Sequence, residues 1–133
     1  MLEKFRVENC PDYVYYIQNF LTVEEENLLL KSVYNVPQTK WTQLSRRRLQ
    51  NWGGIPHHNG MIPEAIPQWL QTWIEKVAGF QVFSHLPNHV LINEYKPNEG
   101  IMVIVEVLGN FLIFTVLEAP LRWTIILIHD SHY

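Results

Sequence analysis

A strand-forming run at residues 90–95, VLINEY, constrains the fold of this chain more than any other feature. It is rich in β-branched and aromatic residues, and the turn-forming segment KPNEG follows it at residues 96–100. Because side chains alternate along a strand, Asn93 and Tyr95 are expected on one face and Glu94 on the other. An amide and a phenol on one face can together hold a small carboxylated ligand. The alternative is that these polar side chains simply face water.

The composition indicates one globular domain with a core of its own. The chain has 133 residues, of which 47% are hydrophobic and 17% are charged. Its net charge of −3 is too near neutral for a generally nucleic-acid-binding surface, so such a function requires a local basic patch. The single cysteine, Cys10, excludes an internal disulfide, and the first residues lack the apolar run of a signal peptide. We therefore expect an intracellular protein of the cytoplasm, the nucleus or both.

Two amphipathic helices are predicted before this strand. The first begins after Thr22, which forms a capping box with Glu25, and it ends before Pro37. The second begins at Pro67 and ends at Gly79. Shorter strands are predicted at residues 5–8, 14–17 and 80–83.

A basic segment flanked by tryptophans, KWTQLSRRRLQNWGG at residues 40–54, is the second informative stretch. Arginines supply phosphate contacts, and the faces of Trp41 and Trp52 offer surfaces on which bases can stack. Gly53 and Gly54 allow the backbone to bend or to approach a neighbour closely. A solvated run of charge between two core tryptophans explains the same pattern equally well.

Three segments, NEYKPNEGIM at residues 93–102, KWTQLS at 40–45 and LQNWGG at 49–54, resemble those of AlkB-type dioxygenases, and of the AlkB homologue six branch in particular. The resemblance is collinear from about Phe5 to Met102. It implies a family that uses Fe(II) and 2-oxoglutarate and folds as a double-stranded β-helix, or jelly roll. We therefore expect an α+β domain at residues 1–102 that contains the N-terminal helices and lid strands of this fold, with a truncated core.

The resemblance also implies an activity and a set of site residues. Relatives of AlkB oxidise an alkyl or methyl group, usually on DNA or RNA whose target base is flipped out of its stack. Asn93 and Tyr95 are then the expected contacts of 2-oxoglutarate. The segment at residues 40–54 lies where AlkB relatives place a substrate-covering lid. Its expected substrate contacts are Arg46, Arg47, Arg48, Asn51 and Trp52.

The iron site that the resemblance implies does not match this sequence. The family's His-x-Asp motif would fall at positions 104 and 106, which are Ile104 and Glu106 here, and an isoleucine cannot bind iron. A replacement site at the C-terminus is not expected, because side chains at positions 129, 130 and 132 do not share one face of a strand. The sequence therefore predicts no metal ligands, no bound iron and a catalytically incomplete, truncated isoform.

Residues 103–133 are expected to be an unrelated, hydrophobic, β-prone tail. Strand-forming runs lie at residues 103–108, 111–117 and 121–128, and charged residues interrupt them, so no membrane span is expected. The change at residue 103 suggests alternative splicing, intron read-through or a gene-model error. The alternative function is a non-catalytic module that binds nucleic acid or protein through the Arg46–Trp52 region.

Overall fold

The structure is a computed structural model that describes residues 2–9, 14–81, 85–99, 111–117 and 122–128. Helices and strands are both present, which confirms the predicted α+β class. This combination of helices and strands is consistent with part of an AlkB-type jelly roll. The helices are α1 (Val23–Tyr34), α2 (Gln68–Ala78) and two 3-10 helices, η1 (Leu2–Phe5) and η2 (Gln38–Lys40).

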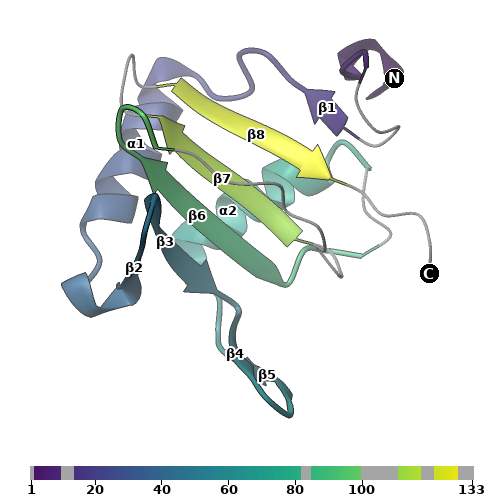
Figure 1. Ribbon diagram of the computed structural model, residues 1–133. Coiled ribbons are helices and arrows are strands. Elements are labelled where there is room, and N and C mark those ends of the chain that lie inside the picture. The colour runs from purple at the N-terminus through teal and green to yellow at the C-terminus, as the bar shows by residue number, and fades with distance from the viewer. Residues whose placement is uncertain (1, 10–13, 82–84, 100–110, 118–121, 129–133) are drawn as a thin grey trace.

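One sheet runs through the molecule, and a separate hairpin extends from it (Figure 1). The sheet has the strand order β1-β8-β7-β6-β3-β2, and its neighbours are antiparallel except for β6 and β7, which are parallel. Its strands are β1 (Val14–Tyr16), β2 (Trp41–Leu44), β3 (Arg47–Trp52), β6 (His89–Tyr95), β7 (Phe111–Leu117) and β8 (Arg122–Ile128). The hairpin consists of β4 (Gly54–His57) and β5 (Gly60–Pro63).

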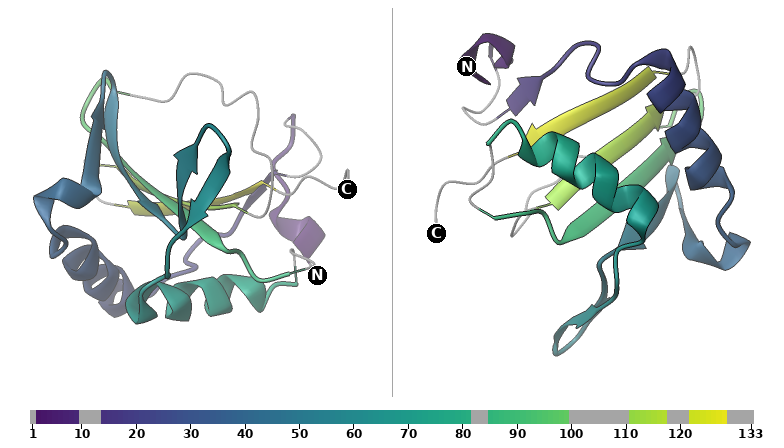
Figure 2. Two further views of the ribbon diagram at one scale, coloured as in Figure 1. Left: turned by 90° about the horizontal axis from the view of Figure 1, so that it is seen from below. Right: turned by 180° about the vertical axis from the view of Figure 1, so that it is seen from behind.

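Both α-helices cover the same face of the sheet, and the core lies between them and the central strands (Figure 2). Val90 and Ile92 project from β6 into this core and are almost completely buried. Each buried side chain of this size contributes about 1.5–3 kcal/mol to folding. The helices contribute Leu29, Val33, Leu70, Trp73, Ile74 and Val77.

Local signals set the limits of the helices largely as predicted. The Thr22 hydroxyl accepts a hydrogen bond from the Glu25 backbone at 3.2 Å, and the Glu25 carboxylate accepts one from the Thr22 backbone at 2.9 Å, which confirms the capping box. Lys76 of α2 also donates to the Glu25 carboxylate at 2.6 Å, and this bond lowers the pKa of Glu25. Pro67 immediately precedes α2 instead of opening it.

Two of the shorter predicted strands are wrong in the part that the structure describes. Residues 5–8 form only an isolated bridge, from Arg6 to Tyr15, because the Arg6 backbone donates to the Glu3 carbonyl and closes a 3-10 turn. Phe80 and Gln81 continue the turn that ends α2, since their N–H groups donate to the carbonyls of Val77 and Ala78.

The other strand predictions in the described residues are confirmed, within a residue at their ends. Strands form at residues 14–16, 89–95, 111–117 and 122–128. The run at residues 103–108 lies outside the described residues. Within the part of the chain that the structure describes, no helix combines the length and apolar character required to cross a membrane.

Gly53 allows two backbone segments to approach each other where the hairpin leaves the sheet. Its φ is +95°, and a Cβ atom at this position would lie 2.1 Å from the carbonyl oxygen of Asn88, just before β6. Gly60, at the hairpin turn, has a φ of +117° and open space where its Cβ atom would be. The two glycines therefore share an unusual backbone conformation, but a close contact is present only at Gly53.

We expect Gly53→Ala to lower the free energy of unfolding by about 3–5 kcal/mol, because backbone atoms must move apart. Gly60→Ala is the matched control and should cost only about 1–2 kcal/mol, the penalty of the left-handed conformation itself. Urea unfolding followed by tryptophan fluorescence measures both values. Equal losses in the two variants would mean that the Asn88 contact has no energetic importance.

Candidate functional site

The pairing of β3 with β6 determines which side chains share a face of the sheet. Leu49 lies opposite Asn93 and Arg48 lies opposite Glu94. Alternation directs one set of side chains toward α1 and α2 and the other set away from them. We call the second set the helix-free face; it comprises Arg47, Leu49 and Asn51 of β3 and Leu91, Asn93 and Tyr95 of β6.

The helix side of the two strands carries a buried charge cluster. The Glu94 carboxylate, 6% exposed, accepts hydrogen bonds from the Arg48 guanidinium and from the hydroxyl of Tyr34 in α1. The guanidinium carbon of Arg48 also lies 4.1 Å from the centre of the Trp41 ring. These contacts join α1, β2, β3 and β6 and confirm the predicted position of Glu94 on the face opposite Asn93.

Glu94 is held in its charged form despite its burial. Burial raises the pKa of this carboxyl, but the hydrogen bonds from Arg48 and Tyr34 outweigh burial, and its pKa is lower than usual. The same pairing raises the pKa of Arg48. The cluster is therefore a stable ion pair that anchors α1 to the sheet, and Glu94 is unsuited to donate a proton near neutral pH.

The helix-free face carries a buried amide with unused hydrogen-bonding capacity. Asn93 is 0% exposed, and neither its Oδ1 nor its Nδ2 atom forms a hydrogen bond with a described residue. Leaving a buried amide without a partner costs about 1–3 kcal/mol, and native structures contain few such groups. The position of this amide is therefore the strongest sign of a ligand site in the described part of the chain.

Two further polar side chains of the helix-free face accompany Asn93. Tyr95 is 7% exposed, and burial raises the pKa of its phenol while the positive charge of Arg47 acts in the opposite direction. The Nε atom of Arg47 is buried and has no hydrogen-bond partner in the described residues. An amide, a phenol and a guanidinium on one face provide a set of donors suited to a carboxylate.

The structure separates the three arginines that were predicted to contact substrate. Arg46 lies in the turn between β2 and β3 and donates to the Asn98 carbonyl at 2.8 Å. Arg47 belongs to the helix-free face, whereas Arg48 pairs with Glu94 on the helix side. The basic run is therefore divided among three environments and does not form one patch.

The remaining two predicted substrate contacts also lie on opposite faces. Asn51 is half-buried on the helix-free face. The Trp52 ring packs edge-on against Trp69 of α2, with 5.6 Å between ring centres, and the Lys40 ammonium lies 4.2 Å from its centre. Trp52 therefore has core and cation contacts in place of a free stacking surface.

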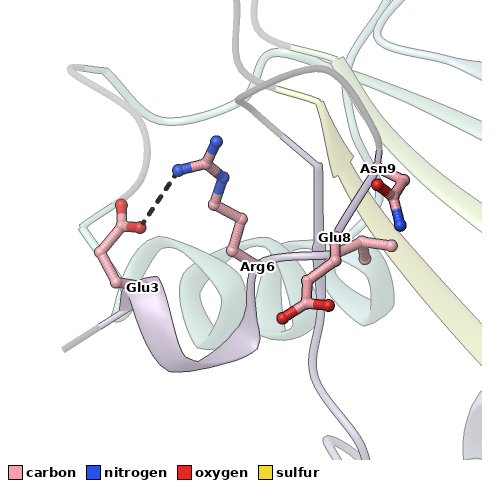
Figure 3. A pocket seen from close by; sticks show the side chains of 5 residues that line it. Glu3, Arg6, Glu8 and Asn9 are labelled. Atoms are coloured by element: carbon pink, nitrogen blue, oxygen red, sulfur yellow. Dashed lines mark ion pairs between the residues drawn. The ribbon is translucent and has the colours of Figure 1, made fainter.

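The described residues contain no cluster of metal ligands, and the polar hollow near the N-terminus carries only a weak ion pair. No three histidine, cysteine, aspartate or glutamate side chains gather there, and positions 104, 106 and 129–132 lie outside this part of the chain. A polar hollow at the N-terminal segment is lined by Glu3, Arg6, Val7, Glu8 and Asn9 (Figure 3). Its ion pair, 3.8 Å between Arg6 Nη1 and Glu3 Oε2, is exposed and contributes little.

We expect the Glu94 cluster to make stability fall in acid. Because the pKa of Glu94 is lowered on folding, its stabilisation is complete above the unfolded-state pKa of about 4.5 and is lost as pH falls through the lower folded-state value. Glu94→Gln should lose this part of the pH dependence and about 3 kcal/mol at pH 7, since Arg48 loses its partner. Denaturant unfolding between pH 7 and pH 3 tests this, with the exposed Glu75→Gln as the control. An unchanged acid profile in Glu94→Gln would exclude the cluster as its cause.

Comparison with known proteins places this chain among relatives longer than itself. No family model matches the sequence. A protein named "Probable RNA/DNA demethylase ALKBH6" from Danio rerio is 53% identical over 102 residues, which are 76% of this chain and 44% of the relative. Uncharacterized protein L905 of Acanthamoeba polyphaga mimivirus is 27% identical, over 76% of this chain and 50% of that protein. The chain thus spans half or less of the length of these relatives.

A more distant match points to the same family. The tRNA (carboxymethyluridine(34)-5-O)-methyltransferase ALKBH8 of Macaca fascicularis is 23% identical over 82% of this chain and 18% of that protein. The comparison with the Danio rerio protein covers 76% of the chain, including β3 and β6, at 53% identity. The chain belongs to the AlkB family.

Proposed function

We propose that this chain is a catalytically incomplete member of the AlkB-type dioxygenases, a family that acts in the oxidative demethylation of RNA or DNA, and that it binds 2-oxoglutarate on its helix-free face. The relatives named as a demethylase and as a tRNA-modifying enzyme support the substrate class. The fully buried amide of Asn93, neither of whose polar atoms has a partner among the described residues, supports the assignment of the cosubstrate site. An intracellular location, in the cytoplasm or nucleus, is part of the proposal.

The residues of the helix-free face fit a dicarboxylic keto acid. In this family, 2-oxoglutarate would supply two of the four electrons that reduce O₂ at Fe(II), and the alkyl group that is oxidised would supply the other two. The Asn93 amide can donate one hydrogen bond to an anionic ligand and accept another from water or a protein group. Because its pKa is raised, the Tyr95 phenol stays protonated near neutral pH and can donate to a carboxylate oxygen. Leu49 and Leu91 lie on the same face of these two strands.

The residues that would bind iron differ from those that would bind the cosubstrate, and the two sites can be lost independently. Ile104 stands where the family motif has its first histidine, and the described residues offer no group of three ligands. We therefore propose that this chain binds 2-oxoglutarate without oxidising it efficiently. The non-catalytic alternative, one nucleic-acid patch over the Arg46–Trp52 region, has less support because Arg48 and Trp52 have partners within the fold.

We expect Asn93→Leu to abolish 2-oxoglutarate binding while stabilising the free chain by about 1–3 kcal/mol, because it removes an unpaired buried amide at nearly constant shape. Gln50→Leu is the matched control, since Gln50 is equally buried but donates to the Val33 carbonyl and accepts from the Trp52 indole. It should destabilise the chain. Calorimetric titration with 2-oxoglutarate and urea unfolding measure the two effects. If Asn93→Leu destabilised the chain and still bound 2-oxoglutarate, the site would lie elsewhere.

We also expect no Fe(II)-dependent conversion of 2-oxoglutarate to succinate above the rate without protein. Mass-spectrometric measurement of succinate, with Asn93→Leu as the background control, checks this. If the wild-type chain converts 2-oxoglutarate to succinate and Asn93→Leu does not, the proposed cosubstrate site stands. The proposal that the iron centre is missing would then be wrong.

A further inference from the structure

The C-terminal strands β7 and β8 lie inside the main sheet, between β6 and β1 (Figure 1). β7 pairs with β6 along its whole length, from Phe111 opposite His89 to Leu117 opposite Tyr95. β8 pairs with β7 on one side and with β1 on the other. Two strands from beyond the AlkB resemblance, which ends at about Met102, therefore occupy interior positions of the sheet.

Strand β6 requires a neighbour on each of its two sides. Ile92 and Asn93 are 0% exposed, so their backbone N–H and C=O groups have no access to water. Buried backbone groups are almost always hydrogen-bonded, and along a strand they point alternately to the two sides. Because β3 pairs with only one side of β6, the other side needs a second strand, and β7 provides it.

Strand β1 depends on the same C-terminal segment. It pairs with β8 through residues 14–16, and it has no other strand neighbour among the described residues. Its further described pairing is the isolated bridge between Arg6 and Tyr15. β8 therefore joins the N-terminal strand to the rest of the sheet.

The sequence of the two strands is typical of interior strands. FLIFTVL at residues 111–117 has no charged residue, and RWTIILI at 122–128 has only Arg122, at its start. Such continuous apolar runs are typical of strands buried within a sheet, whereas edge strands often carry charges or prolines. The connection between the parallel strands β6 and β7, residues 96–110, also has the length that a crossover requires.

We infer that β7 and β8 are an internal strand donor, which fills the edge of β6, holds β1 and forms one cooperative folding unit with residues 14–95. The interaction surface is the edge that β6 would otherwise expose, and its occupant is residues 111–117 of the same chain. Long, apolar, unpaired strand edges promote association between molecules, so internal pairing also prevents β6 from joining a second copy. The inference does not depend on the proposed 2-oxoglutarate site.

Disulfide trapping tests this pairing on the intact chain. Tyr15→Cys combined with Leu127→Cys places two thiols at partner positions of β1 and β8. Opposite Cα atoms of antiparallel strands are about 4.5–5.5 Å apart, which suits a disulfide. Cys10, the only native cysteine, is replaced by serine in every variant. In a glutathione buffer, intact-mass measurement should show an intramolecular disulfide in most molecules.

A pair shifted by one residue is the matched control. Tyr15→Cys combined with Ile126→Cys should form at least tenfold less disulfide than the matched pair. The reason is that Ile126 is the partner of Tyr16, and successive strand positions alternate between the two faces of the sheet.

A second matched pair keeps the test decisive if the first substitutions impair folding. Leu91→Cys combined with Ile113→Cys joins β6 to β7, and Leu91→Cys combined with Leu112→Cys is its shifted control. Circular dichroism identifies the variants that fold. In the matched pairs, the oxidised form should unfold at a higher urea concentration than the reduced form, because the crosslink restricts the unfolded chain.

Each outcome decides for or against the internal donor. Monomers with a disulfide in the matched pairs alone would support it. Disulfide-linked dimers in these pairs would show that the strands come from a second copy, and the internal role would be wrong. Equal disulfide formation in matched and shifted pairs, or none in either, would exclude this register. An unchanged urea midpoint after oxidation would show that the segment unfolds separately and is not part of one cooperative unit.

Discussion

The ion pair between Arg48 and Glu94 fixes the register of β3 against β6, and the rest of the site depends on that register. Side chains in a strand repeat every two residues, so a slip of β3 by one position would move all of its side chains to the opposite face. Arg47 would then enter the helix-packed core, and Arg48 would be separated from Glu94 by the sheet. Tyr34 donates to the same carboxylate, and this bond ties α1 to the correct register as well.

Two fully buried amides, one on each side of the sheet, differ in the hydrogen bonds that they form within the described residues. Gln50 on the helix side uses both ends of its amide within the protein, donating to the Val33 carbonyl and accepting from the Trp52 indole. Asn93, in a neighbouring strand, uses neither end within the described residues. Our proposal explains this difference, because an amide without a partner among the described residues remains available for a ligand.

Local features were predictable from the sequence, and features that depend on strand pairing were not. The capping box of Thr22 and Glu25 and the alternation along β6 follow from short-range patterns. The segment that contains Arg46, Arg47 and Arg48 has few β-branched residues, so its strand was not apparent, and the arginines looked like one basic patch. Only pairing with β2 and β6 makes it a strand and separates the three side chains. The burial of Asn93 likewise depends on tertiary packing.

The order of the chain through the sheet also bears on how this protein folds. The residues of the central ion pair are 46 positions apart, and the β4–β5 hairpin and α2 lie between them. Closing a loop of this length costs roughly 3 kcal/mol in chain entropy before any contact across it can compensate. The capped helix and the hairpin need no such closure and should form early, whereas β3 and β6 should dock late. The helix-free face therefore arises only in the final cooperative step, so a partly folded chain can be rich in helix and still lack a binding site.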